Sequence, residues 1–262
     1  MQPTVLITGA TSGIGEACAK IFAENHYRLI ITGRRRKKLE NLASGLRETF
    51  SVKILPLCFD IRKWKETSSI IKSLPDEWKE IDILLNNAGL SLGLDPIHKG
   101  DVDDWETMID TNIKGLLYMT RLITPAMAER GKGHIINIGS IAGKDVYLNG
   151  NVYCATKHAV DALTKAMRMD LLPYGIKVSQ VAPGAVNTEF SFVRFHGDKQ
   201  RADSVYAGFE PLAAGDVAEA IWFIASRPAH VNVNDILLMP TAQANASQIF
   251  RRCPIFFCLV CR

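Results

Sequence analysis

Hydrophobic residues along the chain form short runs rich in β-branched side chains, and these runs alternate with longer stretches of helical periodicity. A short, continuous apolar run is typical of a strand that is buried on both faces of a parallel sheet. We expect strands at 4–8, 28–32, 52–58, 81–87, 133–139, 176–182 and 234–239. The helical patterns lie near 14–25, 35–49, 64–74, 102–129, 152–173 and 215–226.

This alternation predicts the α/β class: a single Rossmann-type, doubly wound domain, with helices on both faces of a seven-stranded parallel sheet. We expect the domain to span residues 1–250. In such sheets ligands bind at the carboxyl ends of the strands, near the point where the strand order reverses. The stretch 189–213 interrupts the alternation and mixes aromatic with charged residues, which predicts a substrate lid. The alternative is a surface excursion without a role.

The overall composition bears on partners and compartment. The net charge is only +4, so an extended nucleic-acid surface is not expected. No apolar run approaches the roughly 20 residues of a membrane helix, and the N-terminus lacks a signal-peptide pattern. Cys18, Cys58 and Cys154 lie in apolar segments, as is common for reduced cysteines in the cytoplasm, where we expect the protein. The histidines show no paired ligand spacing, so no metal site is expected.

The C-terminal segment 251–262, RRCPIFFCLVCR, is apolar and contains Cys253, Cys258 and Cys261. It is too short to span a bilayer. It could pack on a partner subunit, carry an acyl chain on a cysteine, or result from a splice or reading-frame anomaly. We assign it no role.

A glycine-rich turn, TGATSGIG, follows the first strand and leads into the first helix. Glycines allow a tight turn and a close approach of the backbone to a ligand. The free N–H groups at the start of the helix then favour an anion. The turn therefore predicts a pyrophosphate site, although its glycine spacing differs from the common G-x-G-x-x-G. The residues expected to contact the cofactor here are Gly9, Thr11, Ser12, Gly13, Ile14 and Gly15.

The second strand ends at Arg34 and Arg35, where a site for NAD usually places an acidic residue. A guanidinium at this position suits a 2′-phosphate, so we predict NADP as the cofactor. The alternative is a solvated basic start of a helix. Asp60 and Ile61 follow the third strand, where an adenine ring could lie on the apolar side chain and donate to the carboxylate. The tetrapeptide NNAG ends the fourth strand and adds Asn87, Ala88 and Gly89 to the predicted cleft.

Ser140 lies at the end of the fifth strand, thirteen residues before Tyr153, and Lys157 follows Tyr153 by four. Positions four apart share one face of a helix. If the helix begins near Asn151, both side chains point into the cleft beside Ser140. A fixed ammonium within about 4–6 Å of a phenol lowers its pKa, which would let Tyr153 act as a general acid–base near neutral pH. Ser140 would hold the substrate oxygen, and Lys157 would also contact the nicotinamide ribose.

These motifs, together with TNIKG and PGAVNTEF, resemble the short-chain dehydrogenase/reductase family in its compact subgroup, over residues 3 to about 250. The resemblance implies that Asn112 is a fourth catalytic residue, which kinks its helix and holds a water that links Lys157 to solvent. It also implies that four residues line the nicotinamide: Pro183, Gly184, Val186 and Thr188.

A finer likeness lies in PGAVNTEFSFVRF and RPAHVNVNDILLMPTAQANA, which are similar to NADP-dependent 3-hydroxy acid dehydrogenases that oxidise serine and allo-threonine. That likeness implies a homotetramer. A substrate carboxylate would need a cation, for which Arg194 is the candidate; a solvent-exposed arginine is the alternative. Two other functions stay open: a carbonyl reductase for larger apolar ketones or steroids, and a regulator that binds NADP without turnover.

Overall fold

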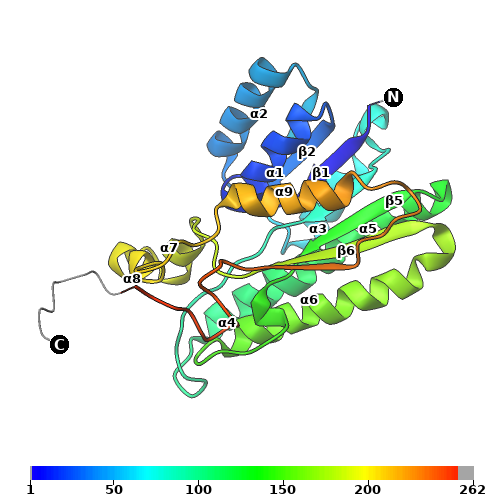
Figure 1. The fold of residues 1–262 in the computed structure, drawn as a ribbon. Coiled ribbons are helices and arrows are strands. Elements are labelled where there is room, and N and C mark those ends of the chain that lie inside the picture. The colour runs from blue at the N-terminus through cyan, green and yellow to red at the C-terminus, as the bar shows by residue number, and fades with distance from the viewer. Residues whose placement is uncertain (1, 253–262) are drawn as a thin grey trace, which may run out of the picture.

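The computed structural model describes residues 2–252 and consists of a parallel sheet covered by helices on both faces (Figure 1). The strands are β1 (Thr4–Ile7), β2 (Arg28–Gly33), β3 (Ile54–Cys58), β4 (Ile83–Asn86), β5 (Gly133–Ile138), β6 (Ile176–Pro183) and β7 (Asp235–Leu238). Their order in the seven-stranded sheet is β3-β2-β1-β4-β5-β6-β7, and every neighbouring pair is parallel. The predicted fold class and all seven predicted strands are thereby confirmed.

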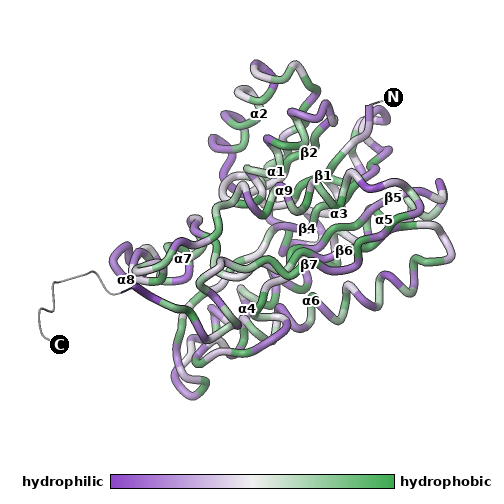
Figure 2. The backbone as a smooth tube through the Cα atoms, viewed as in Figure 1, coloured by the Kyte–Doolittle hydropathy of each residue, from purple (hydrophilic) through white to green (hydrophobic). Residues whose placement is uncertain are grey.

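Two apolar cores lie on opposite faces of the sheet. Helices α1 (Gly13–Glu24), α2 (Arg36–Phe50) and α9 (Ala214–Ala225) cover one face, where Phe22 and Ile221 are fully buried. Helices α3 (Trp64–Lys72), α5 (Leu116–Arg130) and α6 (Asn151–Asp170) cover the other, around Met119 and Val160. Figure 2 shows the hydrophobic backbone positions concentrated in the strands between these layers. This double coverage explains why most strands are continuous apolar runs.

The structure refines one expectation and corrects another. The predicted helix 102–129 is present without a break, but a π-helical segment, η2 (Asp110–Gly115), joins α4 (Val102–Ile109) to α5. The expectation that every strand is buried on both faces was wrong for β7, which lies at the edge of the sheet and leaves Asp235 and Leu237 exposed. Short 3-10 turns also occur: η1 (Asp76–Trp78), η3 (Ile141–Gly143) and η4 (Leu172–Tyr174).

The stretch 189–213 contains two short helices, α7 (Phe190–Arg194) and α8 (Lys199–Ser204), which the hydrophobic pattern did not predict. They project from the body of the molecule beside the carboxyl ends of the strands (Figure 1). Arg251 donates to the backbone carbonyls of Val205 and Ala207, so the last described residues contact this stretch. The cysteines of the tail, Cys253, Cys258 and Cys261, lie outside the described residues.

The strand order reverses between β1 and β4. The chain proceeds outward from β1 through β2 to β3 and then returns to place β4 on the other side of β1. The loops that leave β1 and β4 therefore diverge, and a crevice opens between them. In the part of the chain from Gln2 to Arg252, none of the helices has the length and apolar character needed to cross a membrane.

Candidate active site

A cleft of about 440 Å³ opens at this reversal point, and it is lined by loops from both halves of the sheet. Most predicted site residues line it: Gly9, Thr11, Ser12, Gly13, Ile14, Arg34, Arg35, Asp60, Ile61, Asn87, Ala88, Gly89, Ser140, Tyr153, Lys157, Pro183, Gly184, Val186 and Thr188. Three do not line it: Gly15, Asn112 and Arg194. Sequence reasoning missed other lining residues, among them Thr32, Phe59, Leu90, Thr111, Ile138, Gly139, Glu189, Phe190 and Val193.

The glycine turn has the geometry that its sequence requires. Gly9 and Gly13 have positive φ values of 69° and 57°, which favour glycine. A Cβ on Gly15 would lie 2.4 Å from the carbonyl oxygen of Gly9, so Gly15 lets α1 pack against the turn and does not itself face the cleft. Asn87 fixes the turn from β4, because its Nδ2 donates to the carbonyls of Thr8 and Gly9 at 2.8 and 3.1 Å.

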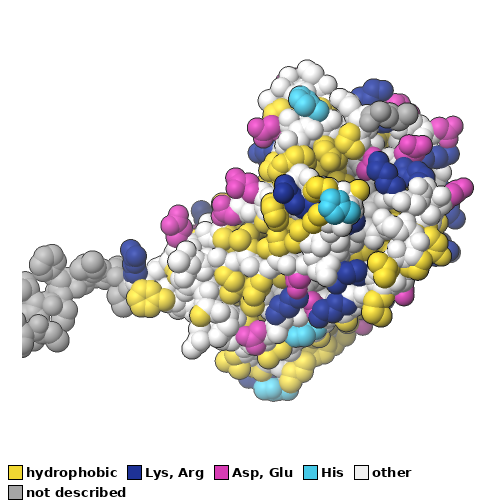
Figure 3. Space-filling view, turned by 45° about the vertical axis from the view of Figure 1, so that its right-hand side comes forward, with side chains coloured by type: hydrophobic (Ala, Val, Ile, Leu, Met, Phe, Trp, Pro, Cys, Tyr) yellow, Lys and Arg dark blue, Asp and Glu magenta, His cyan; other side chains and the backbone are white. Residues whose placement is uncertain are grey.

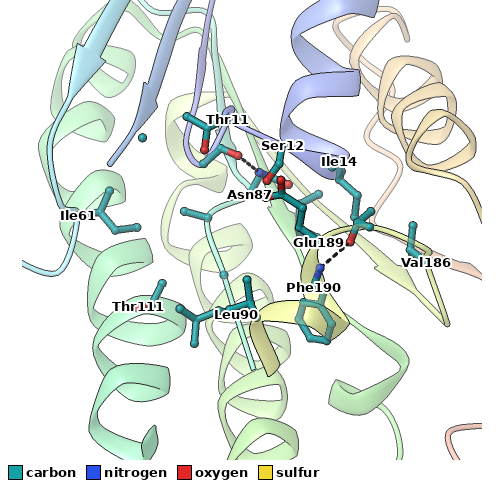
Figure 4. A pocket seen from close by; sticks show the side chains of 18 of the residues that line it. Thr11, Ser12, Ile14, Ile61, Asn87, Leu90, Thr111, Val186, Glu189 and Phe190 are labelled. Atoms are coloured by element: carbon teal, nitrogen blue, oxygen red, sulfur yellow. Dashed lines mark hydrogen bonds between the residues drawn. The ribbon is translucent and has the colours of Figure 1, made fainter. Parts of the chain in front are cut away.

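The basic end of the cleft contains an acid that the sequence pattern did not mark. Arg35 donates from Nε and Nη2 to Thr11 Oγ1 at 3.1 and 2.9 Å, and from Nη2 to Ser12 Oγ at 2.7 Å. Its Nη1 lies 2.6 Å from Glu189 Oε2, and Lys38 Nζ lies 2.6 Å from Glu189 Oε1. Figure 4 shows the Glu189 side chain pointing toward Ser12. Within residues 2–252, the guanidinium of Arg34 makes no hydrogen bond or ion pair.

Asp60, two residues after β3, also lines the cleft. Its carboxylate accepts from Arg62 Nε at 3.0 Å and from Arg62 Nη2 at 2.7 Å. Burial pushes the pKa of Asp60 upward, but the hydrogen bonds and charge of Arg62 outweigh burial, so the net shift of the pKa is downward. Asp60 is therefore ionised and can accept from a ligand. Ile61 and Thr111 present their side chains to the same part of the cleft (Figure 4).

Ser140, Tyr153 and Lys157 meet at the other end of the cleft. Helix α6 begins at Asn151, as the spacing required, and places both Tyr153 and Lys157 among its buried residues. Lys157 Nζ donates to the carbonyl oxygen of Ile138 at 2.9 Å, which fixes the ammonium beside the end of β5. Burial lowers the pKa of Lys157 to about 8.

The expectation that Lys157 lowers the pKa of Tyr153 was wrong, because burial of the phenol dominates its titration. Burial raises the pKa of Tyr153, and the nearby Tyr147 raises it further, whereas a hydrogen bond with Ser140 and the charge of Arg194 lower it. Lys157 Nζ lies 6.0 Å from the centroid of the Tyr153 ring. Ser140 Oγ accepts from the backbone N–H of Ala142 at 3.1 Å, which leaves the hydroxyl hydrogen available to donate. The arrangement can hold a substrate oxygen between a hydroxyl donor and a protonated phenol.

Asn112 lies behind this wall of the cleft, in the π-helical segment η2. Its Nδ2 donates to the carbonyl of Leu90 at 2.8 Å and to Thr156 Oγ1 at 3.0 Å, and its Oδ1 accepts from the N–H of Leu90 at 2.9 Å. Asn112 thus fixes both backbone groups of Leu90, which lines the cleft. π-Helical bulges often occur at functional sites.

Arg194, at the end of α7, lies over the ring of Tyr153. Its guanidinium carbon is 5.4 Å from the ring centroids of both Tyr147 and Tyr153. Its Nε donates to Ser91 Oγ at 3.0 Å, and its Nη2 donates to the hydroxyl of Tyr147. Arg194 lines a small neighbouring pocket that shares Tyr153 with the main cleft.

Comparison with known proteins gives relatives along almost the whole chain. Residues 3–197 match the model of the family described as short chain dehydrogenase. The chain is 48% identical over 243 residues to NADP-dependent 3-hydroxy acid dehydrogenase YdfG from Salmonella typhi, with 92% of this chain and 96% of the relative covered. It is 44% identical over 250 residues to NADP-dependent 3-hydroxy acid dehydrogenase from Schizosaccharomyces pombe, with coverages of 95% and 96%.

Comparison with solved structures gives two serine dehydrogenases of similar fold and sequence. The closed form of a serine dehydrogenase complexed with NADP+ superimposes with a TM-score of 0.89 at 45% identity, covering 95% of this chain and 99% of that one. Serine dehydrogenase from Escherichia coli gives a TM-score of 0.79 at 43% identity, with coverages of 92% and 99%. Because both the family match and the similarity to these relatives extend over most of its length, the chain belongs to the short-chain dehydrogenase family.

Proposed function

We propose that the protein is an NADP-dependent oxidoreductase that interconverts a hydroxyl and a carbonyl group in a 3-hydroxy acid such as serine or allo-threonine. The names of the relatives, NADP-dependent 3-hydroxy acid dehydrogenase, and the serine dehydrogenase structure with NADP+ support this assignment. The cleft supplies the remaining support, from its nucleotide end to its chemical end.

The residues at the nucleotide end fit NADP. The turn of Gly9 and Gly13 presents backbone N–H groups at the start of α1, where a pyrophosphate would bind. Arg34 lines the cleft and offers a guanidinium to a 2′-phosphate. Ile61 provides an apolar surface for adenine, and ionised Asp60 an acceptor. The nucleotide, when bound, supplies the hydride acceptor or donor.

The residues at the chemical end provide the proton transfer. Ser140 donates its hydroxyl hydrogen to the substrate oxygen and holds that oxygen against the phenol of Tyr153. Tyr153 gives its proton to the oxygen in carbonyl reduction and takes it back in alcohol oxidation. Burial keeps Tyr153 protonated, as the reductive direction requires. In the oxidative direction, the hydrogen bond with Ser140 and the charge of Arg194 lower the pKa of Tyr153 and stabilise the phenolate. Asn112, the fourth residue of the predicted catalytic set, holds the backbone of Leu90 in the wall of the cleft.

The assignment to a hydroxy acid depends on one observation, the position of Arg194. Its guanidinium lies beside Tyr153 and, within the described part of the chain, bonds only to the neutral hydroxyls of Ser91 and Tyr147. Among residues 2–252, no carboxylate lies within 4.0 Å of it. A partly buried cation without an acidic partner is a suitable receptor for the carboxylate of a substrate.

A larger apolar ketone is the second candidate substrate. Leu90, Phe190 and Val193 form an apolar wall of the cleft, and the ring of Phe190 lies 5.6 Å from that of Tyr153. We infer that the stretch 189–213, which contributes Phe190, Val193 and Arg194, is the lid over the substrate. Residues 1–250 then form one oxidoreductase domain.

A homotetramer in the cytoplasm is the proposed assembly and location. The edge strand β7 leaves Leu237 half exposed, and α9 does the same with Phe223. Apolar side chains also gather across the middle of the face drawn in Figure 3. An unpaired strand edge with exposed apolar residues is suited to pairing with another subunit. Cys18, Cys58 and Cys154 are free thiols, as expected in a reducing compartment. Analytical ultracentrifugation and cell fractionation would test these two points.

The experiment that tests the function is a substrate panel: L-serine, other 3-hydroxy acids, uncharged secondary alcohols and bulky ketones, each with NADP(H) and NAD(H). We expect the highest kcat/KM for a 3-hydroxy acid with NADP+. Tyr153→Phe should reduce kcat about 10²- to 10⁴-fold while nucleotide binding is retained. A preference for bulky ketones would replace the substrate assignment, and nucleotide binding without any turnover would indicate a regulator.

A further inference from the structure

Glu189 forms an unusual contact at the nucleotide end of the cleft. It lies at the N-terminal end of α7, yet its carboxylate bonds to Arg35 and Lys38, which belong to the start of α2. Both oxygens are engaged, each at 2.6 Å from a cation. Lys38 foremost, with Arg35, lowers the pKa of Glu189 to about 2, so the carboxylate is ionised over the whole working range of pH.

These contacts use the donors that a phosphate would need. A guanidinium has five N–H groups. Arg35 directs Nε to Thr11, Nη2 to Thr11 and Ser12, and Nη1 to Glu189. Bidentate binding of a 2′-phosphate by Arg35 therefore requires at least one of these bonds to be released. The hydroxyls of Thr11 and Ser12 are neutral, whereas Glu189 is an anion that repels a phosphate from the same position.

Breaking the contact of Glu189 with Arg35 and Lys38 also costs little free energy. The side chains of Arg35 and Glu189 are each 42% exposed, and Lys38 is 51% exposed. Exposed ion pairs of this kind contribute little free energy, because water and salt screen them. A 2′-phosphate carries more negative charge than a carboxylate, so it can displace Glu189 from the two cations.

We propose that Glu189 is a specificity-determining residue that competes with the 2′-phosphate of the nucleotide for Arg35 and Lys38. The inference rests on the proposed use of NADP and adds a residue that moderates it. In the free protein the carboxylate offsets one of the two positive charges, and it releases both cations when the phosphate binds. Because Glu189 directly precedes α7, the same release removes a contact that holds the start of α7 at the mouth of the cleft.

The test compares two probes that differ only in the 2′-phosphate, adenosine 2′,5′-bisphosphate and adenosine 5′-monophosphate, by isothermal titration calorimetry. Glu189→Gln should bind the bisphosphate about three- to tenfold more tightly than the wild type, with less than about a twofold change for the monophosphate. The control is Glu40→Gln, which removes the same charge from α2, where Glu40 pairs with Arg36 away from the cleft. It should change neither affinity.

A second variant keeps the test independent of the first. In an Arg35→Met background, the gain from Glu189→Gln should shrink, because only Lys38 remains to be released. The proposal is overturned if Glu189→Gln leaves bisphosphate binding unchanged or weaker, if both probes gain equally, or if the gain persists in full without Arg35. Failure of the NADP assignment has a different signature, namely equal affinity of the wild type for the two probes.

Discussion

The guanidinium of Arg194 lies over the ring of Tyr153, with 5.4 Å between the guanidinium carbon and the ring centroid. Lys157, on the same helix as Tyr153, remains 6.0 Å from that centroid and bonds to Ile138. The cation that contacts the proposed acid–base group therefore comes from the stretch 189–213. In consequence, the position of that stretch affects the ionisation of Tyr153 and, under the proposed role of Arg194, the recognition of the substrate.

Replacing Arg194 should separate charged from uncharged substrates. Arg194→Met should lower kcat/KM for L-serine about 30-fold or more, because a substrate carboxylate would lose its partly buried partner. An uncharged secondary alcohol should lose several-fold less than L-serine, because it loses only the effect of Arg194 on the ionisation of Tyr153. The matched control is Arg201→Met, because Arg201 stacks on Phe195 at 4.4 Å from the centroid in the neighbouring helix α8. Equal losses for both substrates would contradict the role of Arg194.

Arg34 should set the preference for NADP. Arg34→Ser should lower the ratio of kcat/KM for NADP+ to that for NAD+ about 10- to 100-fold, since a charge-assisted hydrogen bond to phosphate would be lost. Arg34→Asp combined with Arg35→Ala should reverse the preference. Arg36→Ser serves as the control, because the Arg36 side chain is 72% exposed and pairs with Glu40. A ratio that stays unchanged in both Arg34 variants would exclude the assignment.

Substitution of alanine at two helical glycines should change the free energy of unfolding in opposite directions. A Cβ on Gly15 would lie 2.4 Å from the Gly9 carbonyl, so Gly15→Ala should lower the free energy of unfolding by about 1–3 kcal/mol. A Cβ on Gly45, within α2, would meet nothing within 4 Å, so Gly45→Ala should raise it by about 0.5–1 kcal/mol. Chemical denaturation of the two variants and the wild type measures both. An equal loss of unfolding free energy in both variants would contradict the role of the close contact at Gly15.

The buried ammonium of Lys157 should make stability depend on alkaline pH. Its pKa is about 8 in the folded protein, below the ordinary value of 10.5 that the unfolded chain retains. Between these values the unfolded chain binds the extra proton, so the free energy of unfolding rises with pH. Relative to Lys157→Met, the wild type should gain about 2 kcal/mol between pH 8 and pH 10. Parallel pH profiles for the two proteins would argue against a buried, titrating Lys157.

The features that could be predicted from the sequence are those that neighbouring residues determine. The strands follow from apolar runs that need two covered faces, and the glycine turn and the Tyr153–Lys157 spacing are local patterns. Helix periodicity could not reveal η2, because the residues of a π bulge keep helical propensities and the segment differs only in its backbone hydrogen bonds. Glu189 was missed because its role depends on Arg35 and Lys38, which meet it only in the folded chain.

The widened turn at η2 can be understood as an inserted residue that the fold has kept. Deleting a single codon within 110–115 would let α4 and α5 join as one regular helix. Each residue of such a helix turns by about 100°, so the side chain of Asn112 would be carried away from Leu90. One extra residue in this helix therefore helps to set the shape of the cleft, because it positions Asn112 to hold Leu90 in the cleft wall.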